Sequence, residues 1–268
     1  MHLDFIKKLL LESGEILRSG FGHVTQIDNK QDQSNIVTES DFKSEELIRK
    51  LISETHPDHN ILGEEHGFED KKSAYTWIVD PLDGTSNYAA QIPWFGVLVA
   101  LVKNGQPIIS GAYLPISNDL YLAQKGKGAL KNNKRIAVAS ETNLKNILCC
   151  YSLDYSIDST KTDREVQIIK NLVQNCRNLR STNSCVDFCL VADGRIGAAL
   201  NQTMKIWDIA APQLIIEEAG GKVTDIEGKQ IVYYPSEASL DQNFTAMAAN
   251  LEVHGMTLQL IKDKQFLY

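Results

Sequence analysis

Positive charge is scarce in this sequence. Its 268 residues contain 27 lysines and arginines against 34 aspartates and glutamates, which gives a formal net charge of −7 at pH 7. A chain of this sign is repelled by nucleic acids and by anionic membrane surfaces. We therefore expect neither of them as a partner held by bulk electrostatics.

Long hydrophobic runs are also missing. No apolar stretch approaches the ~20 residues that a membrane-spanning helix needs. The first residues, Met1 to Lys8, are amphipathic and do not resemble a secretory leader. These features predict a cytoplasmic protein that does not insert into membranes.

Cysteines are few, and they form no disulfide or metal-binding pattern. Their odd number, without a leader, indicates reduced thiols. There is no CxxC pair, so we interpret them as small buried side chains rather than zinc ligands. The five are Cys149, Cys150, Cys176, Cys185 and Cys189.

The first half of the chain predicts two helices packed on a largely antiparallel sheet. Apolar spacing predicts helices over about 2–20 and from Ser40 or Asp41 to about 55. A short strand at 60–65 and a long apolar strand at 95–102 follow. Asn104-Gly105 is a strong hairpin signal that leads into a partner strand at 107–114. A further hairpin is expected over 119–124 and 128–138.

The second half alternates strands with helices. Strands are predicted near 147–152, 179–181 and 196–200, and helices near 164–173, 185–192 and 208–219. Such alternation is typical of an α/β fold. We therefore predict an α/β protein with an α+β domain over 1–140 and an α/β domain over 141–268.

The segment from Trp77 to Tyr88 is the most informative part of the chain. Residues 75–79 read as a buried strand, which we expect to stop at Asp80 because proline follows. Two carboxylates, Asp80 and Asp83, then fall within one turn, and Gly84 gives that turn its freedom. Thr85 to Asn87 are capping residues that begin a short helix. Acids attract a hard cation and a helix start attracts a phosphate group, so the segment indicates metal-assisted phosphate chemistry.

Carboxylates stand at the ends of predicted elements in four segments. Each segment also has an ordinary interpretation: Asp41 and Asp208 as helix caps, the glutamates as a solvated loop, the pair after the strand as a turn. Four converging acids would repel one another and raise each other's pKa, a cost that bound divalent cations remove. The segments contain Asp41, Glu64 with Glu65, Asp80 with Asp83, and Asp208.

Taken together and in order, these segments resemble the inositol monophosphatase family of magnesium-dependent, lithium-sensitive phosphatases. The strongest elements are Gly63-Glu-Glu65, Trp77-Ile-Val-Asp-Pro-Leu-Asp-Gly-Thr-Ser-Asn-Tyr88 and Trp207-Asp-Ile-Ala-Ala211 with Glu218-Ala-Gly-Gly221. Val37-Thr-Glu-Ser-Asp41 and Gly126-Lys-Gly-Ala129 match more weakly. The resemblance spans about residues 30–225 and implies a layered αβαβα sandwich of the sugar-phosphatase type.

The resemblance also implies roles for individual residues. Glu64, Asp80 and the Leu82 carbonyl would hold a first Mg²⁺. Asp80, Asp83 and Asp208 would hold a second, and a third, weaker ion is usual in the family. Thr85, with Glu64 and Asp41 nearby, would orient and deprotonate the attacking water. The Gly84 and Thr85 N–H groups would bind the phosphate.

Substrate contacts follow the family pattern less closely. The resemblance places Asp83, Asn183, Ser184 and Asn201 beside the alcohol part of the substrate, where Asn201 stands in place of the family's glutamate. Lys30 and Glu65 are further candidates. We expect hydrolysis of inositol 1-phosphate or a related polyol or sugar phosphate by a metal-activated water, in a protein that is a homodimer. Histidinol phosphate, fructose 1,6-bisphosphate, adenosine 3′,5′-bisphosphate and NADP are alternative substrates, and a catalytically idle binding or regulatory protein is an alternative of another class.

Two other patterns are set aside. The run from Lys125 to Ala129 is basic and glycine-rich but lacks the spacing of a nucleotide-binding loop, so we interpret it as a hairpin turn. His56, His59 and His66 suggest zinc, yet the surrounding acids favour an oxygen-ligated Mg²⁺.

Overall fold

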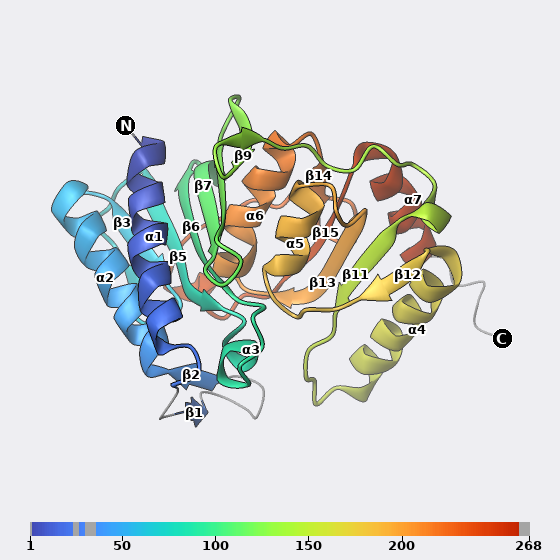
Figure 1. The fold of residues 1–268 in the computed structure, drawn as a ribbon, viewed down its shortest axis with the longest axis horizontal. Coiled ribbons are helices and arrows are strands. Elements are labelled where there is room, and N and C mark those ends of the chain that lie inside the picture. The colour runs from blue at the N-terminus through green and yellow to red at the C-terminus, as the bar shows by residue number, and fades with distance from the viewer. Residues whose placement is uncertain (1, 24–26, 30–35, 263–268) are drawn as a thin grey trace.

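The described chain is built of five layers, helices alternating with sheets, as Figure 1 shows. The computed structural model describes residues 2–23, 27–29 and 36–262. Its sheets have eight and five strands, apart from a small two-stranded pair formed by β1 (Ile27–Asn29) and β2 (Ile36–Thr38). The expected α/β class and αβαβα layering are confirmed.

Helices α1 (His2–Gly20) and α2 (Glu39–Thr55) cover one face of the large sheet. Its strand order is β10-β9-β8-β7-β6-β5-β3-β4, antiparallel except between β3 and β5. A core cluster fills this interface, because α1 and α2 place leucine and isoleucine at helical spacing toward the sheet. The strands are β3 (Asn60–Gly63), β4 (Gly67–Glu69), β5 (Tyr75–Asp83), β6 (Gly96–Lys103), β7 (Gln106–Leu114), β8 (Asp119–Gln124), β9 (Gly128–Lys131) and β10 (Lys134–Arg135).

Helices α5 (Val186–Ala192) and α6 (Ile206–Glu218) lie between the two sheets. Every residue from 209 to 216 of α6 is buried, as expected of a helix that is covered on all sides. The largest core cluster surrounds these helices and joins both sheets into one body. The functional consequence is that the first turn of α6 stands beside the end of β5.

The small sheet has the order β12-β11-β13-β15-β14, and α4 (Ser159–Asn175) and α7 (Leu251–Lys262) pack on its outer face. β11 runs parallel to both β12 and β13, whereas β15 is antiparallel to its neighbours. A third core cluster fills this last interface. The strands are β11 (Leu148–Ser152), β12 (Asn178–Arg180), β13 (Ala198–Met204), β14 (Lys222–Thr224) and β15 (Phe244–Ala249).

Three details differ from the sequence-based expectations. α2 begins at Glu39 with Thr38 as its N-cap, so Asp41 is the third helical residue rather than the cap. α6 likewise begins two residues before Asp208. In both helices the aspartate accepts from the backbone N–H of the N-cap residue, three positions earlier, as an acid at the third helical position commonly does. β1, β2, β4, β14, β15 and α7 were not predicted.

The long strand expected at 95–102 is β6, at the centre of the large sheet. It pairs with β5 and β7, and residues 97–102 are buried. β6 itself therefore offers no exposed surface for the expected homodimer. Trp94, just before it, is 44% exposed. No helix among the described residues is long and apolar enough to cross a membrane.

Candidate active site

A β-bulge at the end of β5 turns two aspartates to the same side. Asp80 pairs with Leu98 of β6, and Asp83 pairs with Gly96. The chain therefore advances three residues along β5 where it advances two along β6, so β5 has one extra residue. Residues three apart on a regular strand point to opposite faces, but the extra residue restores them to one face. Pro81 lies inside the bulge, where its missing N–H interrupts no regular ladder. This is why β5 continues to Asp83 and the prediction that it ends at Asp80 is wrong.

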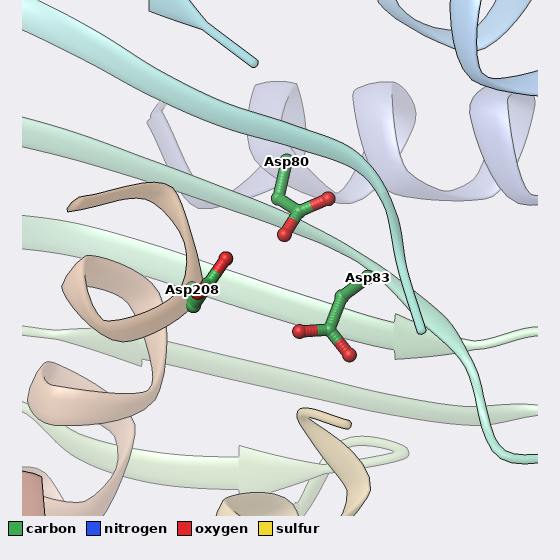
Figure 2. Close-up of side chains that lie close together, drawn as sticks. All are labelled: Asp80, Asp83 and Asp208. Carbon is green, nitrogen blue, oxygen red and sulfur yellow. The ribbon is translucent and has the colours of Figure 1, made fainter. Parts of the chain in front are cut away.

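Asp208 approaches the same point from α6. Figure 2 shows Asp80 and Asp83 extending from β5 and Asp208 from the first turn of the helix. Side-chain oxygens of the three lie within 4.8 Å of one another. The Lys205 N–H donates to Asp208 Oδ2 at 2.7 Å, and the Cys185 N–H donates to Asp83 Oδ1 at 2.5 Å. Backbone donors thus fix the orientation of two of these carboxylates.

Burial raises the pKa of all three carboxyl groups. The pKa of Asp83 rises to about 7 in spite of its bond from Cys185, and those of Asp80 and Asp208 rise well above their usual range. The nearby carboxylates, including Glu64, add repulsion to the effect of burial. Among the described residues that line the cleft here, Lys205 is the one basic side chain, and its Nζ donates to the Asp241 carbonyl at 3.1 Å. An oxygen-rich, uncompensated site of this kind suits a hard divalent cation.

Glu64 is placed beside this trio by the end of β3. The preceding Gly63 lies against the fully buried side chain of Glu45 from α2. Glu45 accepts from the backbone N–H groups of Glu65 and His66 at 2.7 and 3.1 Å. Arg49, one helical turn along α2, pairs with Glu45 at 3.3 Å. A part-buried ion pair therefore fixes the turn that carries Glu64.

Thr85 and Asp41 form a hydrogen-bonded pair. The Thr85 hydroxyl lies 3.1 Å from Asp41 Oδ1 and 3.0 Å from the Leu82 carbonyl oxygen. The other oxygen of Asp41 accepts from the N–H and the hydroxyl of Thr38, at 2.8 and 2.6 Å. Burial raises the pKa of Asp41 to about 6. Asp41 is thus a buried acceptor within reach of the Thr85 hydroxyl.

Gly84 permits the sharp connection from β5 to α3 (Thr85–Ala89). Its φ of +84° lies in the left-handed region. A Cβ atom at this position would approach the Trp94 carbonyl oxygen to 2.7 Å. Only glycine fits here without moving the backbone, and Thr85 becomes the first residue of the short helix.

A cleft of about 470 Å³ brings most of the predicted site residues together. Asp41 adjoins it through Thr85. Glu65 does not line it, although its N–H helps to hold the neighbouring turn. Lys30 lies outside the described residues. The predicted residues that line the cleft are Glu64, Asp80, Leu82, Asp83, Gly84, Thr85, Asn183, Ser184, Asn201 and Asp208.

Sequence reasoning missed Asp154, which also lines the cleft. It follows β11 by two residues, and β13 ends beside it because the two strands are parallel. The position after a parallel strand was the available signal, since ligands gather at such strand ends. Glu45 was missed as well, because nothing in the local helix pattern reveals what its side chain contacts.

The alternative zinc ligands lie elsewhere. The rings of His56 and His59 stack on each other with centroids 4.8 Å apart, and His66 Nδ1 lies 3.2 Å from Glu45. The five cysteines are buried. The glycine-rich turn between β8 and β9 is a hairpin, as predicted, and its Gly126 and Gly128 N–H groups each donate to Glu218 at 2.6 Å.

The chain belongs to the inositol monophosphatase family, whose model matches residues 2–264. It is 34% identical over 267 residues to a protein of Aquifex aeolicus named fructose-1,6-bisphosphatase/inositol-1-monophosphatase, covering 97% of this chain and 95% of that one. The expected family resemblance is confirmed. The chain is a phosphoric monoester hydrolase of a magnesium-dependent family.

Solved structures show the same fold. The extragenic suppressor protein suhB from Bartonella henselae superposes with a TM-score of 0.89 at 26% identity, covering 97% of this chain and 98% of that one. A protein described as an IMPase/NADP phosphatase complexed with Mg²⁺ and phosphate superposes with a TM-score of 0.83 at 23% identity, covering 99% and 98%. At that identity the second comparison concerns the fold alone.

Magnesium should stabilise the folded protein more strongly at higher pH. Folding raises the pKa of Asp83 from 3.8 to about 7, so its contribution to stability is present below the unfolded value and is lost as pH rises through about 7. A bound cation reverses this loss, because it favours the ionised carboxylates. Calorimetry should therefore show a larger Mg²⁺-induced rise in Tm at about pH 8 than at about pH 5. Na⁺ at matched ionic strength is the control, and an equal rise at both pH values would contradict the prediction.

Gly63→Ala should destabilise the protein, because its Cβ would lie 2.1 Å from Glu45 Oε1. We expect a loss of about 1–3 kcal/mol in the free energy of unfolding, typical of overpacking, together with lower activity. Gly255→Ala in α7 is the matched control, since a Cβ there meets nothing within 4 Å. It should be neutral or stabilising by up to ~1 kcal/mol. Similar denaturation midpoints for the two variants would show that Glu45 does not constrain this turn.

Proposed function

We propose that this protein hydrolyses inositol 1-phosphate, or a closely related polyol or sugar phosphate, to the free alcohol and phosphate. The observation that carries the proposal is one cleft lined by the aspartate trio and by Thr85, whose hydroxyl is hydrogen-bonded to the adjoining Asp41. The name of the Aquifex relative supports this class of substrate. The uncatalysed hydrolysis of phosphate monoesters is among the slowest reactions known, so an enzyme that catalyses it requires this density of charge.

The carboxylates of the cleft, with one backbone carbonyl, would form two metal sites. Glu64, Asp80 and the Leu82 carbonyl would hold one Mg²⁺, and Asp80, Asp83 and Asp208 would hold another, with a third ion bound more weakly. When bound, the ions supply positive charge against the phosphate and lower the pKa of a water molecule. The oxygen-only donor set and the raised pKa values of the trio fit this cation.

Thr85 and Asp41 provide a path for the proton of the attacking water. Thr85 donates its hydroxyl hydrogen toward Asp41 Oδ1, which leaves a lone pair on Oγ1 to accept from water. Asp41 can take up a proton near neutral pH, because burial raises its pKa to about 6. Glu64, at the same cleft, is the other acceptor that would help to orient the water.

The start of α3 provides N–H groups for the phosphate oxygens. Gly84 is the left-handed N-cap of α3 and Thr85 is its first residue, and N–H groups at a helix start have no partner within the helix. Both residues line the cleft. We therefore assign phosphate binding to these two groups.

Asn183, Ser184 and Asn201 would contact the alcohol part of the substrate, with Asp83 at the boundary. Asn183 has a φ of +54°, as expected of a residue in a glycine-like position. The Asn201 amide oxygen accepts from the Thr203 N–H at 2.8 Å, so its side chain is held in place. These contacts do not choose among polyol, histidinol or nucleotide-linked phosphates by themselves.

A substrate panel tests the proposal. Phosphate release should be measured with and without Mg²⁺ from inositol 1-phosphate, fructose 1,6-bisphosphate, histidinol phosphate, adenosine 3′,5′-bisphosphate and NADP. Mg²⁺-dependent release that is fastest from inositol 1-phosphate is the expected result. Faster release from another compound would replace the proposed substrate, and Mg²⁺ binding without any release would favour the idle regulatory alternative.

Asp83→Asn should abolish most turnover without unfolding the protein. The change removes one ligand charge from the trio, so we expect kcat to fall at least about a hundredfold, because a catalytic metal contributes several kcal/mol. The Tm of the metal-free protein should stay the same or rise, since one source of repulsion disappears. Asp70→Asn, at an exposed site paired with Lys72, changes the charge equally and is the control. Near-normal kcat in Asp83→Asn would refute the assignment.

Lithium should inhibit the enzyme by occupying a magnesium position, as the family resemblance implies. The effect should weaken as Mg²⁺ is raised, whereas a general salt effect would not. Assays with LiCl and NaCl at tens of millimolar separate the two, because both screen charge equally. Identical rates in the two salts would contradict the prediction.

The homodimer is also a proposal, and light scattering tests it.

A further inference from the structure

The cleft contains an aspartate outside the proposed metal ligands. Asp154 follows β11 at the edge where β11 and β13 end side by side. Ser152 pairs with Asn201 at the last step of that ladder, and continuing the register by two residues brings Asp154 beside Thr203. The side chain is half-buried and lines the same cleft as Asp208.

Two neutral donors hold the Asp154 carboxylate in place. Asn183 Nδ2 donates to Oδ1 at 2.7 Å, and the Thr203 hydroxyl donates to Oδ2. The Thr203 N–H in turn holds the Asn201 amide oxygen. Asp154 therefore lies at the centre of the polar network to which both substrate-side asparagines belong.

This carboxylate keeps its charge uncompensated within the described part of the chain. No lysine, arginine or histidine of those residues pairs with it, and its two bonds come from an amide and a hydroxyl. A carboxylate has about four lone-pair positions, so roughly two remain for a ligand. Hydrogen bonds to a charged acceptor are about twice as strong as neutral ones, which makes Asp154 the strongest acceptor in this network.

A phosphate group would be repelled by this charge, whereas an alcohol hydroxyl would be bound by it. The aspartate trio and the Thr85–Gly84 turn account for the phosphate end of a ligand. The network around Asp154 supplies acceptors for the other end.

We propose that Asp154 is a specificity-determining residue that accepts hydrogen bonds from hydroxyl groups on the alcohol part of the substrate. The inference rests on the proposed function and narrows it to monoesters of polyhydroxylated alcohols. Asp154 takes no part in proton transfer or phosphate binding. Its contribution is to distinguish a polyol phosphate from a monoester that lacks hydroxyl groups.

Asp154→Asn tests the proposal with little change of shape. The asparagine oxygen can still accept from Asn183, so the loop before α5 keeps its anchor while the charge is lost. The two substrates are inositol 1-phosphate, which carries hydroxyls, and p-nitrophenyl phosphate, which carries none. We expect kcat/KM for inositol 1-phosphate to fall about tenfold more than that for p-nitrophenyl phosphate, mainly through KM.

Asp158→Asn is the matched control, because Asp158 is exposed, caps α4 and does not line the cleft. It makes the same change in net charge and should leave both substrates unaffected. An equal fall for both substrates in Asp154→Asn would show that the residue only supports the loop, and no fall for either would show that it does not contact the alcohol. Both results overturn the inference.

The wild-type protein separates this inference from the proposed function. If it releases no phosphate from either compound in the presence of Mg²⁺, the proposed hydrolysis fails. Calorimetric titration with inositol 1-phosphate then still tests Asp154, because its Asn variant should bind about tenfold more weakly than the wild type. Equal affinity would overturn the inference.

Discussion

Carboxylates that lie side by side away from water repel one another, and this chain holds one buried and two half-buried aspartates with side-chain oxygens within 4.8 Å of one another. The rest of the molecule holds these three carboxylates together in spite of their repulsion. The bulge in β5 turns Asp80 and Asp83 to one face, and the first turn of α6 brings Asp208 to meet them. All three carboxylates can be ionised together at low cost only when a cation shares the site. The fold is therefore complementary to a cation that it takes from solution.

The supports of the site are backbone donors and buried side chains that contact no substrate. Glu45 holds the turn after β3, the Cys185 N–H holds Asp83, and Thr38 holds Asp41. Each support belongs to a different element. The accuracy of the site therefore depends on the packing of the layers as a whole, rather than on any single loop.

Apolar periodicity predicted the α/β class, and the family resemblance predicted the layers. The short acidic motifs are local signals, and the structure places Glu64, Asp80, Asp83 and Asp208 in one cleft. The sequence did not predict that β5 passes through Pro81, since a bulge depends on the register with β6. It placed Asp41 and Asp208 one turn too early in their helices, because an acid at the third position looks like a cap when the true cap is Thr38 or Lys205. The role inferred for Asp154 depends on its hydrogen bonds with Asn183 and Thr203, which lie far along the chain, so the local sequence does not reveal it.

The position of α6 between the two sheets has a consequence for assembly. Asp80 and Asp83 come from the amino-terminal half, and Asp208 comes from the carboxy-terminal half. The proposed second metal site therefore forms only when both halves have packed around α6. A cation bound there would connect distant parts of the chain in the same way as a covalent cross-link, so its release would lower the stability of the packed halves as a whole.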